Sequence, residues 1–394
     1  MRRNLFIRLT LWGVMPSDVR TQRISQWASG NPQPPVRMEI HPTDRCNLKC
    51  RFCWQVEMPG DFDFSRELPD DKWKSLVHEA GQMGVKEWIV SGGGEPFMRP
   101  ALTLELMRII KSYGMWGQLT TNGTMVQEQA VKDIVEMGWD QVQISLDGPD
   151  AGSQDYLRAQ KSVFSRAVRT AQRLTDHKRL LGSERPYVGF NTIITRRNYT
   201  RLAEHIQLAH DVGFQLVYFE PLYAGYVQQE RLHLDTAETE EMQPYIEEAK
   251  KLADNLGVST NVERFRLRKD FLDKGKLSNT ILREAGSHPD PWLSLPCYQP
   301  WFLMAVKGSG LAGCCSSFEI GEHIHEKTLS EVWYGETFNR LRTGMLKKNL
   351  PYYCDKCSIY VVMDNKEIRE KMHQVNVPAP PTKGILSWPL LRRG

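Results

Sequence analysis

The chain has 394 residues, which is enough for roughly two to three domains. Hydrophobic residues make up 41% of it and charged residues 25%, which excludes collagen, coiled coil and wholesale disorder. The net charge of +4 gives no general reason to expect nucleic acid or an anionic membrane as a partner, and no apolar run is long enough to span a bilayer.

The chain starts with a basic and partly apolar stretch in which Arg8 interrupts the apolar run. No small-residue cleavage site follows, so we expect residues 1–35 to be a covering segment or a short strand and not a signal peptide. The absence of a secretion signal favours a cytoplasmic protein.

The eight cysteines form two groups near opposite ends of the chain, at positions 46, 50, 53, 297, 314, 315, 354 and 357. Clustered thiols in a long chain of a reducing compartment indicate metal or iron–sulfur ligands. The first group has the spacing C-x3-C-x2-C. Three thiolates on one tight loop can hold three irons of a [4Fe–4S] cube and leave the fourth iron open, whereas zinc normally takes four protein ligands.

Short apolar strands alternate with helices between the two groups. We predict strands over residues 36–42, 86–91, 116–121, 140–146, 187–194 and 215–220. We predict helices over residues 68–83, 100–113, 125–138, 162–180 and 198–212. This alternation predicts an α/β fold with a parallel sheet or an open barrel. The first cysteine group follows the first strand, at the end of the sheet where such folds gather their chemistry.

The next three strands end in residues suited to a ligand. These ends read Ser91-Gly92-Gly93-Gly94-Glu95-Pro96, Thr120-Thr121-Asn122-Gly123 and Ser145-Leu146-Asp147-Gly148. Glycines let the backbone approach a ligand closely, and a carboxylate suits an ammonium group. The small hydroxyl and carboxylate groups suit ribose. A nucleotide P-loop is excluded because the required Lys-Ser/Thr pair is missing.

These motifs, in this order, resemble those of the radical S-adenosylmethionine (SAM) superfamily over roughly residues 36–222, with Arg158 beyond them. The resemblance implies an open (β/α)6 partial TIM barrel. It implies that Cys46, Cys50 and Cys53 ligate a [4Fe–4S] cluster with an open iron site for SAM. It further implies a set of SAM-contacting residues: Phe52 by the adenine, Gly93, Gly94 and Glu95 at the amino group, Thr121 and Asn122 beside them, Ser145 and Asp147 at the ribose, Arg158 at the carboxylate, and Asn191 on the adenosine side.

The second cysteine group resembles the auxiliary-cluster domains called SPASM and Twitch. Its C-x12-G-x4-C element runs from Cys297 to Cys315, and Cys354 and Cys357 form a terminal C-x2-C. A full SPASM domain continues with more cysteines, so the resemblance implies one auxiliary [4Fe–4S] cluster held by these four residues. Cys314 could replace Cys315, and a zinc knuckle is the alternative metal site.

The sequence divides into five expected regions: the N-terminal segment 1–35, a radical SAM core over 36–225, a helical connector over 226–290, an auxiliary-cluster domain over 291–360, and an extended tail over 361–394. We expect a surface helix over 238–256 in the connector and a helix over 328–343 in the auxiliary domain. His323 and His325 are expected to be exposed loop residues.

The resemblance implies reductive cleavage of SAM to a 5′-deoxyadenosyl radical, which abstracts hydrogen from a substrate C–H bond with help from the auxiliary cluster. The segment before Cys46 is too short for the leader-binding domain that many peptide-modifying relatives carry. We therefore expect a small natural-product intermediate, such as an amino sugar or cyclitol, undergoing dehydrogenation or epimerisation. Maturation of a ribosomally made peptide by crosslinking, epimerisation or oxidation is the alternative, and a non-catalytic electron carrier is a more distant one.

Two further expectations concern proton transfer and the reductant. Tyr218 and Glu220, at the tip of the sixth predicted strand, are candidates to donate or accept a proton. A flavodoxin- or ferredoxin-type protein is the expected reductant, with no nucleic-acid or membrane partner.

Overall fold

The computed structural model describes residues 17–57, 64–222, 231–266, 277–315, 321–357 and 359–374. They belong to two units, which are described one at a time. The first unit contains the chain up to Ile40, residues 66–89 and the chain from Lys274 onward; the second contains residues 41–65 and 90–273. None of the helices in the described ranges is both long and apolar enough to cross a bilayer.

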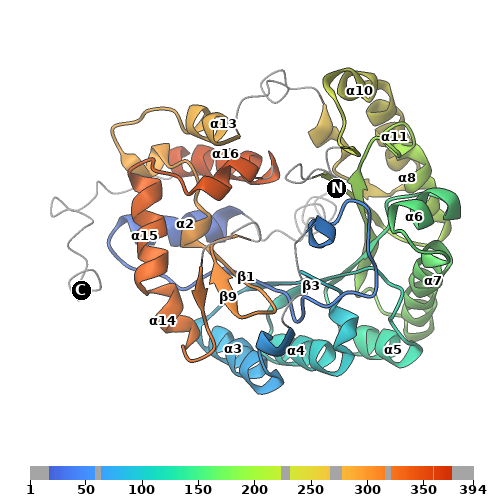
Figure 1. Ribbon diagram of the computed structural model, residues 1–394, viewed down its shortest axis with the longest axis horizontal. Helices are drawn as coiled ribbons and strands as arrows, with labels where there is room; N and C mark the ends of the chain where they lie inside the picture. The colour runs from blue at the N-terminus through green and yellow to red at the C-terminus, as the bar shows by residue number, and fades with distance from the viewer. Residues whose placement is uncertain are drawn as a thin grey trace. The chain divides into compact units, whose positions relative to one another are not determined.

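The second unit is built from parallel strands joined by helices. Its strands are β3 (Trp116–Thr121), β4 (Gln141–Ser145), β5 (Tyr187–Ile194), β6 (Leu216–Pro221) and β7 (Ser259–Thr260), side by side in that order with every neighbouring pair parallel. Its longer helices are α4 (Pro100–Ser112), α5 (Glu128–Glu136), α6 (Ala151–Leu157), α7 (Val163–Leu181) and α8 (Leu202–Asp211). In Figure 1, α4, α5, α7 and α8 follow one another along the outside of these strands.

Side-chain periodicity explains why these segments take up their structures. Along β3 the side chains alternate between partly exposed and buried, as expected for a strand with two different faces. Along α7 the buried residues recur at helical spacing, and Gly182 ends the helix in the left-handed conformation that glycine adopts most easily. The α/β pattern predicted from the sequence therefore arises from local amphipathicity.

The helix predicted over residues 238–256 is two helices, α10 (Thr236–Glu241) and α11 (Gln243–Leu256). Pro244 lies in the first turn of α11, where its missing N–H group costs nothing. Proline inside a continuous helix would remove a hydrogen bond, so the break falls there. Four short 3-10 turns complete the described part of this unit: η1 (Trp54–Glu57), η2 (Phe64–Arg66), which crosses into the first unit, η3 (Pro96–Met98) and η4 (Val262–Phe265).

The first unit has a smaller mixed sheet. Its strands are β1 (Arg37–Ile40), β2 (Glu87–Val90, whose last residue is counted with the second unit), β8 (Leu303–Val306), β9 (Leu311–Gly313) and β10 (Glu322–His323), in the order β10-β9-β8-β1-β2. Strand β8 pairs parallel to β1, while β8, β9 and β10 are antiparallel. Gly310 turns the chain between β8 and β9 at a φ of +78°, and a side chain there would meet the His325 ring.

The remaining helices of the first unit are α2 (Ser17–Ala28), α3 (Asp70–Met83), α13 (Leu277–Ala285), α14 (Leu329–Trp333), α15 (Glu336–Leu346) and α16 (Ile359–Gln374), with short 3-10 turns η5 (Pro291–Ser294), η6 (Gln299–Trp301) and η7 (Tyr352–Lys356). Helices α2 and α16 pack against each other (Figure 1).

Two predictions for this unit need correction. The tail is not extended over residues 361–374, because α16 buries Ile368 and Met372 on one side and so gains helix-stabilising packing. The helix predicted over 328–343 is interrupted at Gly335, where a new helix starts. The expected covering segment is helical from Ser17, and both residues 1–16 and the tail beyond residue 374 lie outside the described residues.

The six predicted strands are all present as β1 to β6, and β3 and β5 have the predicted bounds. The pairing of β3 to β7 confirms parallel strands with intervening helices in the second unit.

Candidate active site

The first cysteine group lies on a loop of the second unit that is held by backbone hydrogen bonds. The Cys53 N–H donates to the Cys50 carbonyl (3.0 Å), and the Arg51 N–H donates to the carbonyl of Leu157 (2.9 Å), the last residue of α6. The Leu48 N–H points at the Cys46 sulfur (3.5 Å). Main-chain contacts therefore fix the positions of all three cysteines.

The thiols of this loop perturb one another. Desolvation raises the pKa of Cys46 to about 12, and the nearby Cys50, Glu95 and Cys53 add to the shift. Desolvation likewise raises the pKa of Cys53 to about 11, with Cys50 again contributing. Thiols with such values stay protonated at neutral pH unless a metal cation favours the thiolate form. The loop is thus suited to metal binding and unsuited to a free nucleophile.

The glycine turn after β2 packs directly against the start of the cysteine loop. The Gly94 N–H donates to the Thr43 carbonyl (3.1 Å), and the Glu95 N–H donates to the Arg45 carbonyl (2.8 Å). A Cβ atom on Gly94 would lie 2.0 Å from the Arg45 oxygen, and one on Gly93 would lie 2.1 Å from an Asp44 oxygen. Only glycine permits this approach, which brings the GGEP motif and the cysteines together as expected.

Glu95 links the end of β2 to the end of β3. It is only 2% exposed, and its Oε1 accepts hydrogen bonds from the Thr121 hydroxyl (2.5 Å) and the Phe97 N–H (3.1 Å). Its Oε2 accepts from the Asn122 N–H (2.7 Å). The carboxylate therefore aligns the two strand ends as well as presenting negative charge to Cys46.

Asn122 reaches back to the cysteine loop. Its side-chain N–H donates to the Asn47 Oδ1 (2.9 Å), and the Asn47 amide donates to the Thr124 hydroxyl (2.9 Å). Asn122 Oδ1 in turn accepts from the Thr124 N–H (2.9 Å). Asn47 was not among the predicted site residues. Asn47 directly follows Cys46 in the loop, and an asparagine at that place has no sequence signature of its own.

A buried ion pair connects the end of β4 to the cluster loop. Asp147 is fully buried; its Oδ1 accepts from the Ile193 N–H (2.9 Å), and its Oδ2 pairs with Arg158. Arg158 also points an N–H at the Cys50 sulfur (3.5 Å), and its guanidinium lies 5.2 Å from the centre of the Phe52 ring. Arg158 thus places a fixed positive charge beside a predicted cluster ligand.

Three other candidates lie in one row across the strands. In the register of β4, β5 and β6, Ser145 is opposite Asn191, and Asn191 is opposite Tyr218. Side chains at register partners of a sheet face the same side. The Asn191 Oδ1 is buried with no hydrogen-bond partner in the described part of the chain, as expected of a group that awaits a ligand. Glu220 lies on the same face of β6, two residues beyond Tyr218.

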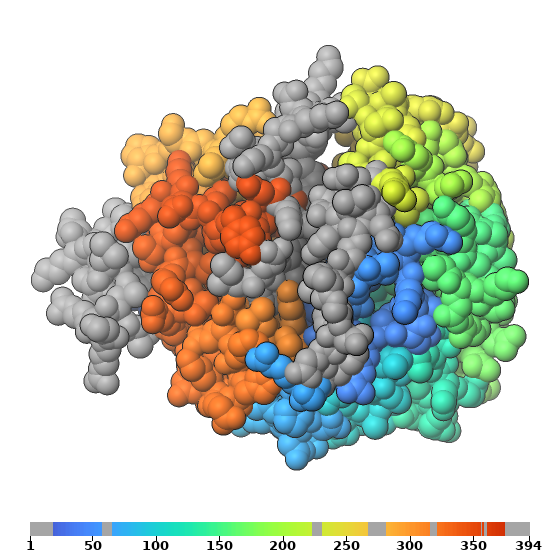
Figure 2. All heavy atoms as spheres, viewed as in Figure 1, coloured from blue at the N-terminus to red at the C-terminus, as the bar shows by residue number. Residues whose placement is uncertain are grey.

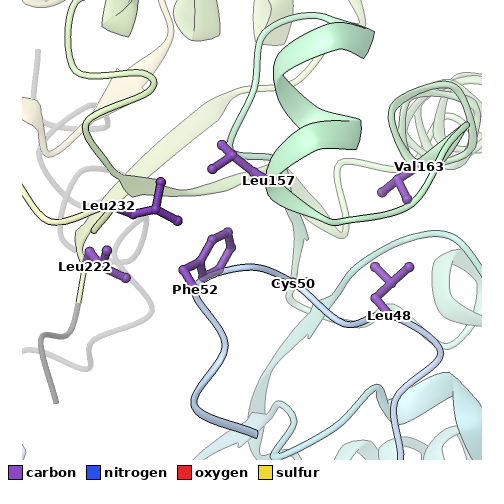
Figure 3. Close-up of a cluster of buried hydrophobic side chains, with 7 residues drawn as sticks. All are labelled: Leu48, Cys50, Phe52, Leu157, Val163, Leu222 and Leu232. Atoms are coloured by element: carbon purple, nitrogen blue, oxygen red, sulfur yellow. The ribbon is translucent and has the colours of Figure 1, made fainter. Parts of the chain in front are cut away.

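Phe52 lies within an apolar cluster. Figure 3 shows its ring between Leu157, Leu222 and Leu232, with Leu48 farther along the loop and Val163 at the start of α7. Phe52 is 6% exposed. The cluster is drawn from the cysteine loop, the segment after β4, the start of α7 and the segment after β6, so apolar packing holds the loop over these strand ends. In Figure 2 the blue cysteine loop lies at the surface beside the green segment of α6 and α7.

The second cysteine group lies in the first unit. Cys297 and Cys314 are buried, and Cys315, Cys354 and Cys357 are partly exposed. Burial raises the pKa of Cys297 to about 12, with Cys315 adding to the shift. Burial also raises the pKa of Cys354, and Cys297 and Cys315 add to that shift. Cys314 contacts Cys315, so the structure brings both candidates to the group and leaves the choice between them open.

No three His, Cys, Asp or Glu side chains within the described ranges are arranged to hold a single metal ion. A single ion draws its thiolates to within about 2.3 Å of one point, whereas the cysteines around a [4Fe–4S] cube bind separate irons. His323 is exposed as expected but lies in β10 and not in a loop, and His325 is partly buried with Nε2 3.1 Å from the Arg66 carbonyl oxygen.

Comparison with known proteins identifies the family. The model of the radical SAM superfamily matches residues 40–209, the stretch that carries the cysteine loop, the glycine turn and the ends of β3 to β5. Residues 40–209 therefore carry a radical SAM domain, and the expected resemblance to this superfamily is confirmed. Members of this superfamily use SAM and a [4Fe–4S] cluster, which confirms the two cofactors predicted for the core. The raised thiol pKa values, the glycine cradle and the unpartnered Asn191 oxygen fit these groups.

Two relatives match this radical SAM chain over most of their length. A tungsten-containing aldehyde ferredoxin oxidoreductase cofactor-modifying protein of Pyrococcus furiosus is 24% identical over 327 residues, 80% of this chain and 85% of the relative. A PqqA peptide cyclase of Ruegeria pomeroyi is 26% identical over 337 residues, 82% of this chain and 79% of the relative.

Among solved structures, SuiB of Streptococcus suis bound to SAM has a TM-score of 0.60 at 15% identity, covering 84% of this chain and 74% of SuiB. SuiB bound to the precursor peptide SuiA gives the same TM-score at 17% identity, with 84% and 75% covered. The predicted fold class, an open α/β barrel with parallel strands, is confirmed.

Proposed function

We propose that this radical SAM enzyme modifies a ribosomally made peptide. The observation that carries the proposal is the contact between the cysteine loop and the glycine turn, in which the Glu95 N–H donates to the Arg45 carbonyl. It supports a joint site for the cluster and SAM. When bound, these groups supply one-electron cleavage of the sulfonium and removal of a hydrogen atom from a C–H bond.

The peptide substrate rests on the relatives. PqqA peptide cyclase and the SuiB–SuiA complex are named for peptides, and the former matches this chain over 79% of its own length. The substrate expected from the sequence, a small molecule such as an amino sugar or cyclitol, has no such support. The cofactor-modifying relative keeps a non-peptide substrate as a second candidate.

The proposal assigns roles to the chain's own residues. Cys46, Cys50 and Cys53 hold the cluster. Gly93 and Gly94 let the backbone approach the SAM amino group, while Glu95, Thr121 and Asn122 keep that turn aligned. Ser145 and Asn191 face the adenosine, and Phe52 packs beside the adenine. Arg158 stays the proposed contact of the SAM carboxylate, whereas Asp147, predicted at the ribose, is buried and acts through its pairing with Arg158. Tyr218 and Glu220 remain the proposed proton donor or acceptor.

The auxiliary site is a separate part of the proposal. Cys297, Cys354 and Cys357 hold one auxiliary [4Fe–4S] cluster, with Cys315 or its neighbour Cys314 as the fourth ligand. Mutual electrostatic effects among these thiols support a common site. A flavodoxin- or ferredoxin-type protein supplies the electron.

Deuterium transfer tests the substrate class. Precursor peptides encoded beside the gene are synthesised with perdeuterated residues and incubated with the reduced protein and SAM. We expect deuterium in the 5′-deoxyadenosine formed and a peptide product of altered mass. Deuterium from a labelled sugar or cyclitol, with none from any peptide, would contradict a peptide substrate.

A further inference from the structure

A cavity of about 510 Å³ in the second unit is lined by four arginines. Its lining residues are Arg51, Tyr156, Arg196, Arg197, Arg231 and Leu232. The volume falls in the range of sites for small ligands. We propose that this cavity binds neighbouring carboxylates of the substrate peptide, which makes an acidic pair or run beside the modified residue a requirement for recognition. The proposal rests on the proposed function for the identity of the ligand.

Two of the arginines flank one aromatic ring. The Arg51 guanidinium lies 4.5 Å from the centre of the Tyr156 ring, and the Arg197 guanidinium lies 4.9 Å from it. The Arg51 Nε also donates to the Tyr156 carbonyl (2.9 Å). Stacking on a shared ring fixes the planes of two guanidinium groups, and planar fixed guanidiniums bind carboxylates through paired hydrogen bonds.

The arginines of the cavity are only partly neutralised by neighbouring carboxylates. Arg196 is paired with Asp235 and Glu238. Across the described ranges of the chain, by contrast, no carboxylate forms an ion pair with the remaining arginines of the cavity, Arg51, Arg197 and Arg231. Three unneutralised guanidinium groups around one recess repel each other, and an incoming polyanion would relieve that repulsion.

The cavity adjoins the cysteine loop. Arg51 follows Cys50 in the chain, and its N–H is held by the Leu157 carbonyl. Leu232 lines the cavity and also packs in the apolar cluster around Phe52 (Figure 3). A ligand in the cavity would therefore contact the loop that carries the cluster ligands, and none of the predicted SAM-binding residues lines the cavity.

The shape of the site favours a peptide's side chains over the face of an acidic reductant. A recess suits short carboxylate side chains that enter it, whereas docking of a folded electron carrier requires a broader and flatter contact area. Docking of the reductant at this cavity is the competing explanation that the experiment must distinguish.

Calorimetric titration of hexaglutamate into the anaerobically purified, cluster-containing protein tests the proposal without SAM or reductant. We expect binding to the wild type and no binding of hexaglutamine. Arg231→Gln and Arg197→Gln should each weaken the binding of hexaglutamate about tenfold, because each removes one charge-assisted contact. Arg231→Lys should retain most of the affinity.

Matched controls separate the cavity from general charge. Arg179 is exposed on α7 and paired with Asp176, so Arg179→Gln should bind hexaglutamate as the wild type does. Arg231 is exposed and forms no hydrogen bond or ion pair in the described part of the chain, so misfolding does not explain a loss in that variant. Equal binding by the wild type and all cavity variants would overturn the proposal.

Two other results would also overturn it. Binding of pyrophosphate but not of hexaglutamate would make the cavity a phosphate site. Absence of hexaglutamate binding, together with slower electron transfer from a reduced flavodoxin to the Arg197→Gln and Arg231→Gln variants, would make it a docking surface for the reductant. A failure of the proposed function would be recognised separately, because labelled peptides would then transfer no deuterium to 5′-deoxyadenosine, whatever the outcome of the hexaglutamate titration.

Discussion

Glu95 is a buried carboxylate whose two oxygens accept three hydrogen bonds, two of them from backbone N–H groups. In Glu95→Gln one amide N–H₂ must face a donor, which leaves buried groups unsatisfied. We expect the free energy of unfolding to fall by about 1–3 kcal/mol, measured by urea denaturation. The control Glu136→Gln, at an exposed helix position, should change it by less than about 0.5 kcal/mol. Equal effects of the two changes would show that Glu95 does not link the strand ends.

Arg158 places a positive charge 3.5 Å from the Cys50 sulfur. Such a charge stabilises the reduced cluster, which is the more negative state. Arg158→Gln should therefore lower the reduction potential of the cluster by about 60 mV, a tenfold change for one electron, in a titration followed by electron paramagnetic resonance. Arg173→Gln, which changes an exposed arginine on α7, should leave the potential unchanged. A potential unaffected by Arg158→Gln would remove this residue from the cluster environment.

At the scale of elements, the glycine turn and the cysteine loop form one packed unit. Gly94→Ala would place a Cβ atom 2.0 Å from the Arg45 carbonyl oxygen, next to Cys46. Because the loop must move, we expect the anaerobically reconstituted variant to hold less iron and sulfide per chain than the wild type. In the control Gly152→Ala, within α6, the new Cβ atom would come no closer than 3.2 Å to its nearest neighbour, an Asp150 oxygen. This variant should retain the full iron and sulfide content. Full iron content in Gly94→Ala would show that the turn does not shape the loop.

Strands and helices could be predicted where each element carries its own periodicity. The alternating pattern of Trp116–Thr121 sufficed for β3, and the parallel order followed from the alternation with helices. The pairing of β8 with β1 could not be predicted, because its four apolar residues lie more than 260 positions from their partners and carry no pairing signal. Helix α16 was missed because the proline-rich stretch after it suggested an extended tail.

Only those parts of the site that belong to a sequence motif could be predicted. The cysteines and the GGEP motif have fixed spacing, so the sequence predicted that they meet. The links through Asn47 and the pairing of Asp147 with Arg158 depend on contacts between distant segments. The arginine cavity assembles arginines from three such segments and Tyr156 from a fourth, and it has no signature in the sequence.

At the scale of the whole molecule, the two cysteine groups lie in different units, so loss of the cluster in one group should leave the cluster in the other intact. Cys354→Ala should lower the iron content from about eight to about four per chain, since each cluster holds four irons. It should keep SAM cleavage and lose the modified peptide. Loss of SAM cleavage with an intact first cluster would mean that the second site supports the whole fold. Cys314→Ala and Cys315→Ala, compared in the same assay, identify the fourth ligand.

The central claim is that the loop of Cys46, Cys50 and Cys53 holds the cluster at which SAM is cleaved. Its most direct test is the quantity of 5′-deoxyadenosine and methionine formed by the anaerobically purified, reduced protein incubated with SAM. We predict equal amounts of both products from the wild type and none from Cys50→Ala, which keeps the second cysteine group. Cleavage by Cys50→Ala at the wild-type rate, or none by the iron-loaded wild type, would contradict the account.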